Sequence, residues 1–191
     1  PGLTVCDRVF LFRNLLTINT MSQLELEEIY LDGLECLEYG NVVEAKKKFE
    51  EVLASEPGYG RVYNYLGWIY HKYFYDYATA EEMYNAVLRL SPEFPPVYLN
   101  YICLLTETDK WEHLRYILEK AVKIPGVRKS QVWFYYGRLF EHNENYEIAL
   151  EYYAKGVKAE TEENDLRIFR ESIERCKMKH TQADKWISII A

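Results

Sequence analysis

The sequence predicts an all-α fold in which antiparallel helix pairs repeat along the chain. Two sets of positions, mostly occupied by glycine and alanine, recur at nearly constant intervals. The first set lies at spacings of 34, 35 and 35 residues and consists of Gly33, Gly67, Ile102 and Gly137. The second set lies at spacings of 35, 34 and 35 residues and consists of Ala45, Ala80, Leu114 and Ala149. Self-similarity with this period is typical of solenoids, in which each helix pair packs only on its neighbours.

The most complete copy of the repeat lies between residues 133 and 153. Its aromatic and small positions are Trp133, Tyr136, Gly137, Phe140, Tyr146, Ala149 and Tyr153. This spacing resembles that of the tetratricopeptide repeat (TPR), and the resemblance covers roughly residues 24–160. The resemblance implies a right-handed α-α superhelix. It also implies a concave groove, lined by the first helix of each repeat, that binds a peptide or a helix of a partner protein.

Turn residues divide the chain into four expected repeats followed by a closing helix. The repeats are expected at residues 22–57, 58–92, 93–126 and 127–161, and the closing helix at residues 162–179. Ser22 with Glu25 three residues later is the signature of a capping box, and it marks the start of the first helix. The closing helix has one apolar stripe and a charged remainder, which suits the end of a repeat array. The alternative is that it forms the first helix of a truncated fifth repeat.

Two segments flank the expected repeats. Residues 1–21 form an N-terminal extension, which is either a short amphipathic helix or an artificial addition that precedes a natural start at Met21. Residues 180–191 form a tail that is rich in tryptophan and isoleucine near its end. Because such a tail is poorly solvated, we expect it to dock on the closing helix or on a neighbouring molecule, which allows self-association. The alternative is a disordered end.

The second and third repeats depart from the regular pattern. The turn within the second repeat is one residue longer than the others and carries Tyr73, Phe74, Tyr75 and Tyr77. These rings either cap the edge of the core or form a local docking patch. In the third repeat, Ile102 and Leu114 replace the small residues. Because small residues let two helices approach closely, the sequence predicts altered superhelical curvature at this repeat.

Composition narrows the classes of partner. The formal net charge is −7, which argues against nucleic acid and against an anionic membrane surface. The 4 cysteines lie far apart without metal-ligand spacing, so reduced thiols and a cytoplasmic location are expected. No nucleophile motif, phosphate-binding glycine loop or metal motif occurs in the sequence, so no catalytic residue, cofactor or metal site is expected.

The candidate site is the groove that the resemblance implies. The repeat phase assigns to it Tyr30, Arg61, Asn64, Trp68, Lys72, Leu99, Phe134 and Arg138. Aromatic anchors beside arginine are typical of binding hot spots. Cations gathered in an acidic chain favour a ligand with one or two large apolar side chains flanked by Asp or Glu. The alternative is that Arg61 and Arg138 pair with carboxylates of neighbouring repeats and only stabilise the superhelix.

The sequence therefore predicts a non-enzymatic scaffold for protein–protein interaction. One alternative is a regulatory or recruiting domain of a larger enzyme or complex. A second alternative is an RNA-binding helical repeat, because related helix pairs read RNA. The acidic balance and the glycine and alanine positions disfavour RNA.

Overall fold

The computed structural model describes the backbone of residues 21–190 and the side chains of residues 21–183; the N-terminal extension lies outside this range. Within it the chain forms nine α-helices and one π-helical turn, without a strand. The elements are α2 (Gln23–Glu38), α3 (Val42–Ser55), α4 (Gly60–Ile69), η1 (Tyr70–Phe74), α5 (Tyr77–Leu90), α6 (Pro95–Glu107), α7 (Trp111–Ala121), α8 (Lys129–His142), α9 (Tyr146–Ala159) and α10 (Glu163–Ile190).

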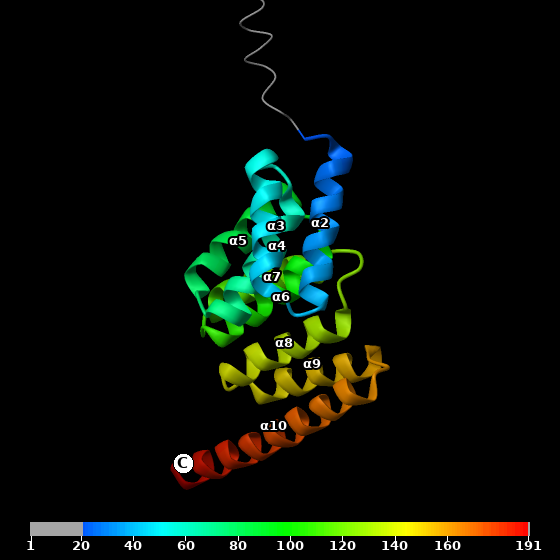
Figure 1. The fold of residues 1–191 in the computed structure, drawn as a ribbon. Helices are drawn as coiled ribbons and strands as arrows, with labels where there is room; N and C mark the ends of the chain where they lie inside the picture. Colours follow the sequence, from blue (N-terminus) through cyan, green and yellow to red (C-terminus); the bar gives the residue numbers. More distant parts are fainter. Residues whose placement is uncertain (1–20, 191) are drawn as a thin grey trace, which may run out of the picture.

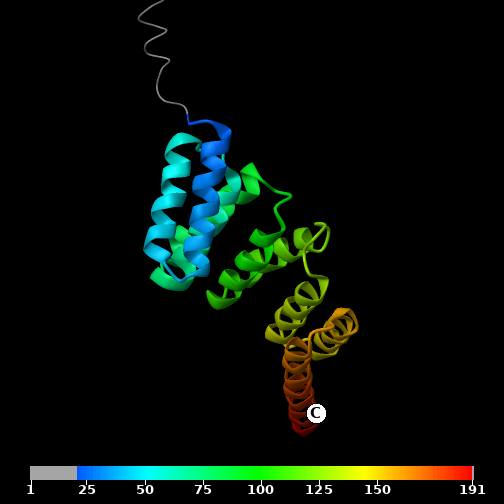
Figure 2. The same ribbon diagram turned by 45° about the vertical axis from the view of Figure 1, so that its right-hand side comes forward.

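The helices pack as successive pairs, α2/α3, α4/α5, α6/α7 and α8/α9, and α10 covers the last pair (Figure 1). The direction of the helices changes along the array, so that α8, α9 and α10 run across the direction of α2 and α3 (Figures 1 and 2). The all-α superhelical solenoid of antiparallel helix pairs is thus confirmed. The capping box at the start of α2 is also present, since Ser22 and Glu25 exchange hydrogen bonds of 2.7 and 3.3 Å.

The recurring glycines make room for an aromatic ring of the second helix in each pair. A Cβ atom placed on Gly33 would lie 2.6 Å from the ring of Phe49, and one on Gly67 would lie 2.7 Å from the ring of Tyr84. At Gly137 the corresponding distance to the ring of Tyr153 is 2.4 Å. The three partner rings are fully buried, as are the recurring alanines. The repeat period therefore marks the points where paired helices touch.

Replacing Gly137 by Leu is expected to lower the free energy of unfolding by about 1–3 kcal/mol, because the added side chain overpacks the α8/α9 contact. Denaturant unfolding of the variant measures this loss. Gly137→Ala should give a smaller loss in the same direction, since fewer atoms meet the Tyr153 ring. Wild-type stability in the Leu variant would contradict the assignment of Gly137 as a close-contact position.

The third pair uses larger side chains at the same two positions. Ile102 and Leu114 are both fully buried, at the positions where the other pairs have glycine and alanine. Pro95 and Pro96 open α6, where the missing amide hydrogens cost no helical hydrogen bond. The altered curvature at this repeat stays a prediction.

The longer turn of the second repeat contains a π-helical segment, η1, directly after α4. The wider turn accommodates the additional residue. It ends at Tyr75, which has a left-handed backbone conformation with φ of 54°. Tyr73, Phe74 and Tyr75 are exposed, and the Tyr73 ring also meets the ring of Trp68 edge-on at 5.4 Å. The turn thus combines contact with the core edge and exposed aromatic surface.

The closing helix is longer than the sequence analysis expected. A helix was predicted over residues 162–179 with a separate tail, whereas α10 continues without a break to Ile190. The physical reason is the absence of any Pro or Gly after Gly156, so that nothing terminates the helix. A Cβ atom on Gly156 would lie 2.2 Å from the Phe169 ring, which shows how closely α10 packs on α9.

Candidate functional site

Hollows on the first-helix side of the array lie in two separate places. One hollow, of about 330 Å³, lies between α2, α4 and α6 and includes Asn64, Trp68 and Asn100. A larger hollow, of about 420 Å³, lies between α8 and α10 and is called here the C-terminal basin. Its lining residues are Trp111, Phe134, Arg138, Glu141, His142, Ile168, Glu171, Ser172, Arg175 and Lys179.

An apolar pocket of about 220 Å³ adjoins the C-terminal basin. It shares Phe134 and Ile168 with the basin, and its other lining residues are Cys103, Gln131, Tyr135, Asp165 and Phe169. Phe134 is fixed between the two hollows, because its ring lies 5.3 Å from that of Phe169 and 5.8 Å from that of Tyr153. The arrangement places a mostly apolar pocket next to a charged one.

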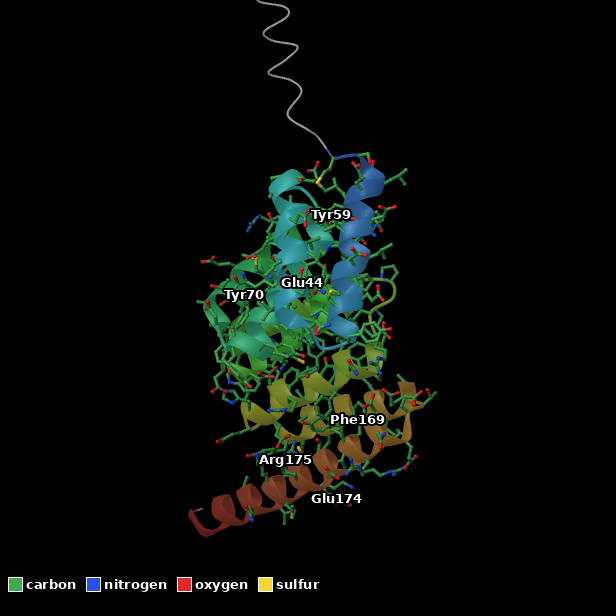
Figure 3. All side chains as sticks on the ribbon, viewed as in Figure 1. Glu44, Tyr59, Tyr70, Phe169, Glu174 and Arg175 are labelled. Carbon is green, nitrogen blue, oxygen red and sulfur yellow. The ribbon has the colours of Figure 1, made fainter. Side chains whose placement is uncertain are left out.

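Glu141 joins three helices at the floor of the basin. Its carboxylate accepts two hydrogen bonds of 2.9 Å from Arg175 of α10, one of 3.0 Å from Lys179 and one of 2.7 Å from the hydroxyl of Tyr153 on α9. Figure 3 shows Arg175 and Phe169 on the side of α10 that faces the rest of the array, opposite Glu174. Burial acts to raise the pKa of Glu141, but the hydrogen bonds from Arg175 and Tyr153 lower it to about 2. The carboxylate is therefore ionised and neutralised by α10.

Charged pairs of this kind follow the repeat phase. Lys72 donates to Glu107 over 2.6 Å, and these residues stand one repeat apart, as do Glu141 and Arg175. The positions form a series at intervals of 35, 34 and 34 residues: Lys72, Glu107, Glu141 and Arg175. Buried His71 also contacts Glu107, with 2.8 Å between Nε2 and Oε2. The first pair ties η1 to α6, and the second ties α8 to α10.

Arg138 differs from these paired cations. No ion pair joins Arg138 or Arg61 to a carboxylate within residues 21–183, whereas the alternative in the sequence analysis expected both to pair with carboxylates of neighbouring repeats. Arg138 lines the basin and is half-buried, whereas Arg61 is exposed and lines none of the hollows described above. The basin therefore contains one cation without a carboxylate partner from the described part of the chain.

The structure divides the site that the sequence analysis proposed. Asn64 and Trp68 lie in the hollow between α2, α4 and α6, whereas Phe134 and Arg138 lie in the basin. Tyr30 is buried in the core, where its ring meets those of Phe49, Tyr59 and Tyr65. Lys72 forms an ion pair with Glu107, and half-buried Leu99 packs against the core.

Sequence reasoning missed the contribution of α10 to the basin. The residues concerned are Ile168, Glu171, Ser172, Arg175 and Lys179. They share one face of the helix, at spacings of three, one, three and four residues. Two features of the sequence could have indicated this contribution: the spacing of these residues and the position of Arg175 one repeat after Glu141. Both were overlooked because residues 162–179 were interpreted only as a polar closing helix.

Other kinds of site find no support in the described part of the chain. No group of three or more His, Cys, Asp or Glu side chains within residues 21–183 is placed to hold a metal ion. Cys36, Cys103 and Cys176 are free thiols. None of the helices in the described range combines the length and the hydropathy that a membrane crossing requires.

Comparison with solved structures defines the class of fold. A thermophilic TPR protein from Thermus thermophilus is 18% identical, with a TM-score of 0.61 over 88% of this chain and 90% of that chain. PilF from Pseudomonas aeruginosa is 20% identical, with a TM-score of 0.65 over 82% of this chain and 75% of that chain. MamA from Desulfovibrio magneticus RS-1 is 17% identical, with a TM-score of 0.63 over 83% of this chain and 96% of that chain.

The chain therefore has the fold of a TPR array, as the spacing of its small residues indicated. At these identities the likeness concerns the fold alone. No protein-family model and no curated protein matches the sequence.

Proposed function

We propose that this protein is a non-enzymatic interaction scaffold that binds a peptide or helix of a partner protein, and that the C-terminal basin is its principal binding site. The observation that carries the proposal is Arg138, a half-buried cation without a carboxylate partner in residues 21–183, beside the apolar pocket at Phe134. The TPR-like fold supports an interaction scaffold in general, since such arrays present extended concave surfaces for binding.

The ligand chemistry follows from the two adjoining hollows. An apolar side chain of the ligand fits the pocket between Phe134 and Ile168, and Ile168 is 42% exposed and available for contact. An acidic side chain next to it reaches Arg138, because guanidinium groups bind carboxylates through two parallel hydrogen bonds. The ligand is therefore a segment with one or two large apolar residues flanked by Asp or Glu.

The hollow at Trp68 extends the same face toward the first repeats and offers a second apolar contact. Lys72, the cation that the repeat phase assigned to this part of the groove, is already neutralised by Glu107. The hollow at Trp68 therefore contributes apolar contact rather than charge. The three free thiols agree with a reducing compartment, so the proposal places the protein in the cytoplasm.

The proposal is tested with two labelled peptide pools of the same apolar composition, one with Asp and Glu flanks and one with Lys and Arg flanks. Fluorescence anisotropy should show binding of the acidic pool, and this binding should weaken as salt rises. Arg138→Glu should weaken it by about tenfold or more, which corresponds to about 1.4 kcal/mol.

Arg115→Glu is the matched control, because Arg115 is exposed on α7, lies outside the basin and undergoes the same change of charge. It should leave the affinity for the acidic pool nearly unchanged. Equal losses in both variants would show that only net charge matters, and the assignment of the basin would then be wrong. Equal binding of the two pools would contradict the proposed ligand chemistry.

A further inference from the structure

The first helix, α2, exposes the face that the later first helices use to pack on the preceding pair. One repeat position carries this contact in α4, α6 and α8, and its residues are Tyr65, Asn100 and Tyr135. The Tyr65 ring lies 5.9 Å from the Tyr30 ring of α2. Asn100 donates to Asn64 of α4 over 3.0 Å. α2 lies at one end of the array (Figures 1 and 2), and within the described residues no helix precedes it.

Leu31 takes this position in α2, 34 residues before Tyr65. Leu31 is 52% exposed, and Leu24, two helical turns earlier on the same face, is 79% exposed. Glu28 and Glu35 are its neighbours on this face, and both are exposed. The equivalent residues of α4, α6 and α8 are apolar and buried: Val62, Ile69, Val97, Leu104, Val132 and Leu139. The face of α2 therefore keeps an apolar residue at its centre and has a carboxylate on either side of it.

The negative charge of the chain is concentrated at this end. Residues 21–60 contain ten Asp or Glu residues and three Lys residues, so their formal charge equals the net charge of −7 of the whole chain. α2 contributes six of these carboxylates and no cation. The helix at the other end is different, since residues 163–183 of α10 mix four acidic and five basic residues. A terminal helix needs a polar outer face, but this need does not require a single sign of charge.

The neighbouring helix does not neutralise the two glutamates beside Leu31. All three lysines of α3 already pair with other carboxylates, namely those of Asp32, Glu44 and Glu50. Neither Glu28 nor Glu35 forms an ion pair with residues 21–183. A cation that approaches this face therefore meets two carboxylates that have no competing cation among the described residues.

We propose that the face of α2 formed by Leu24, Glu28, Leu31 and Glu35 binds a basic amphipathic helix of a partner protein. The partner is a helix because the equivalent face packs on helices throughout the rest of the array. Two apolar side chains of the partner, about 10.5 Å apart, meet the two leucines, and its Lys or Arg residues lie opposite the two glutamates. This site is separate from the C-terminal basin and binds a ligand of the opposite charge.

The test is fluorescence anisotropy of the full chain with a labelled amphipathic peptide of about three heptads, with leucine along its seam and lysine beside it. The chain should bind this peptide, and binding should weaken as salt rises. The matched probe is the same peptide with a central proline, which breaks the helix. It should bind at least about tenfold more weakly, because an unstructured basic segment does not hold its apolar side chains in register with both leucines. Equal binding of the two peptides would contradict a helical partner.

Charge reversal on α2 tests the place of binding. Glu28→Lys with Glu35→Lys should weaken binding of the lysine peptide by about tenfold or more. Glu147→Lys with Glu151→Lys is the matched control, since both residues are exposed on α9 and undergo the same change of charge. It should leave the affinity nearly unchanged. Equal losses in the two variants would show that only net charge attracts the peptide, and the assignment to α2 would be wrong.

Removal of the leucines tests the apolar part of the contact. Leu24→Ser with Leu31→Ser keeps the charge and should weaken binding by about tenfold, while helical circular dichroism stays at the wild-type level because both side chains are exposed. Wild-type affinity in this variant would overturn the proposal. Arg138→Glu should not reduce binding of the lysine peptide, so a failure of the basin and a failure of this site are distinguishable.

Two further measurements address other occupants of the face. Light scattering of the full chain should show no self-association that the leucine variant abolishes. Such self-association would assign the face to a second copy. Binding of the lysine peptide should not depend on residues 1–20. Binding that appears only after their removal would assign the face to the chain's own N-terminal extension, and either result would overturn the proposal.

Discussion

Replacing Glu141 by Ala is expected to lower the free energy of unfolding by about 2–3 kcal/mol and to release α10 from the array. The variant leaves Arg175, Lys179 and the Tyr153 hydroxyl without their common acceptor. The loss stays below that of a fully buried ion pair, because Arg175 and Lys179 are 43% and 48% exposed and water solvates them in the variant. Hydrogen exchange should increase in α10 while α2–α5 keep their protection.

The same residue predicts how stability depends on pH. The pKa of Glu141 is lowered in the folded chain from its ordinary value of 4.5 to about 2. Its contribution is therefore complete above pH 4.5 and is lost as the pH falls toward 2, because the unfolded chain binds the proton first. The stability difference between wild type and Glu141→Ala should shrink over this window in denaturant titrations.

Glu151→Ala is the matched control, since Glu151 is exposed on α9 and makes no ion pair with residues 21–183. It should change stability by less than about 0.5 kcal/mol. A Glu141→Ala protein with wild-type stability, or with a pH-independent difference from wild type, would show that the carboxylate does not hold α10.

Gly156→Leu is expected to lower the free energy of unfolding by about 3 kcal/mol, at the upper end of the usual effect of overpacking. A Cβ atom at this position already lies 2.2 and 2.3 Å from two atoms of the Phe169 ring. That ring is 2% exposed and cannot move without displacing α10. Because α10 forms one wall of the basin, Gly156→Leu should also weaken binding of the acidic peptide pool. Denaturant unfolding and anisotropy measure the two effects.

Ala154→Leu is the control for the added side chain, because Ala154 is exposed on the same helix. It should leave stability and binding nearly unchanged. The double variant Gly156→Leu with Phe169→Ala should be less destabilised than the sum of its single variants, since removing the ring makes room for the leucine. Additive losses would mean that Gly156 and Phe169 do not share the contact.

The fold could be predicted from the sequence because the packing requirements of each repeat involve residues that are close in the sequence. Gly33, Gly67 and Gly137 recur with one period since each must admit a ring from the following helix. The Pro and Gly residues at or near the ends of the pairs mark the turns in the same phase. Helix pairing in a solenoid depends on neighbours within one or two repeats, so the spacing alone specified the architecture.

The candidate site depended on contacts that spacing does not specify. The repeat phase treated Lys72 and Arg138 alike, but Glu107 neutralises Lys72 while Arg138 has no such partner within the described residues. Tyr30 shares the phase of a groove residue, yet neighbouring rings bury it. Charge balance and exposure are set by side chains from adjacent repeats, which a position within one repeat does not reveal.

The sequence thus determined the all-α repeat, its four helix pairs and its close contacts, because these follow from local periodicity. Only the tertiary structure showed the roles of Glu141 and α10. The carboxylate gathers Arg175, Lys179 and Tyr153 from two other helices, and the uninterrupted closing helix becomes a wall of the basin. Such a cluster forms only when side chains from three helices come within hydrogen-bonding distance at the same time. The repeat period in the sequence specifies only which helices are neighbours.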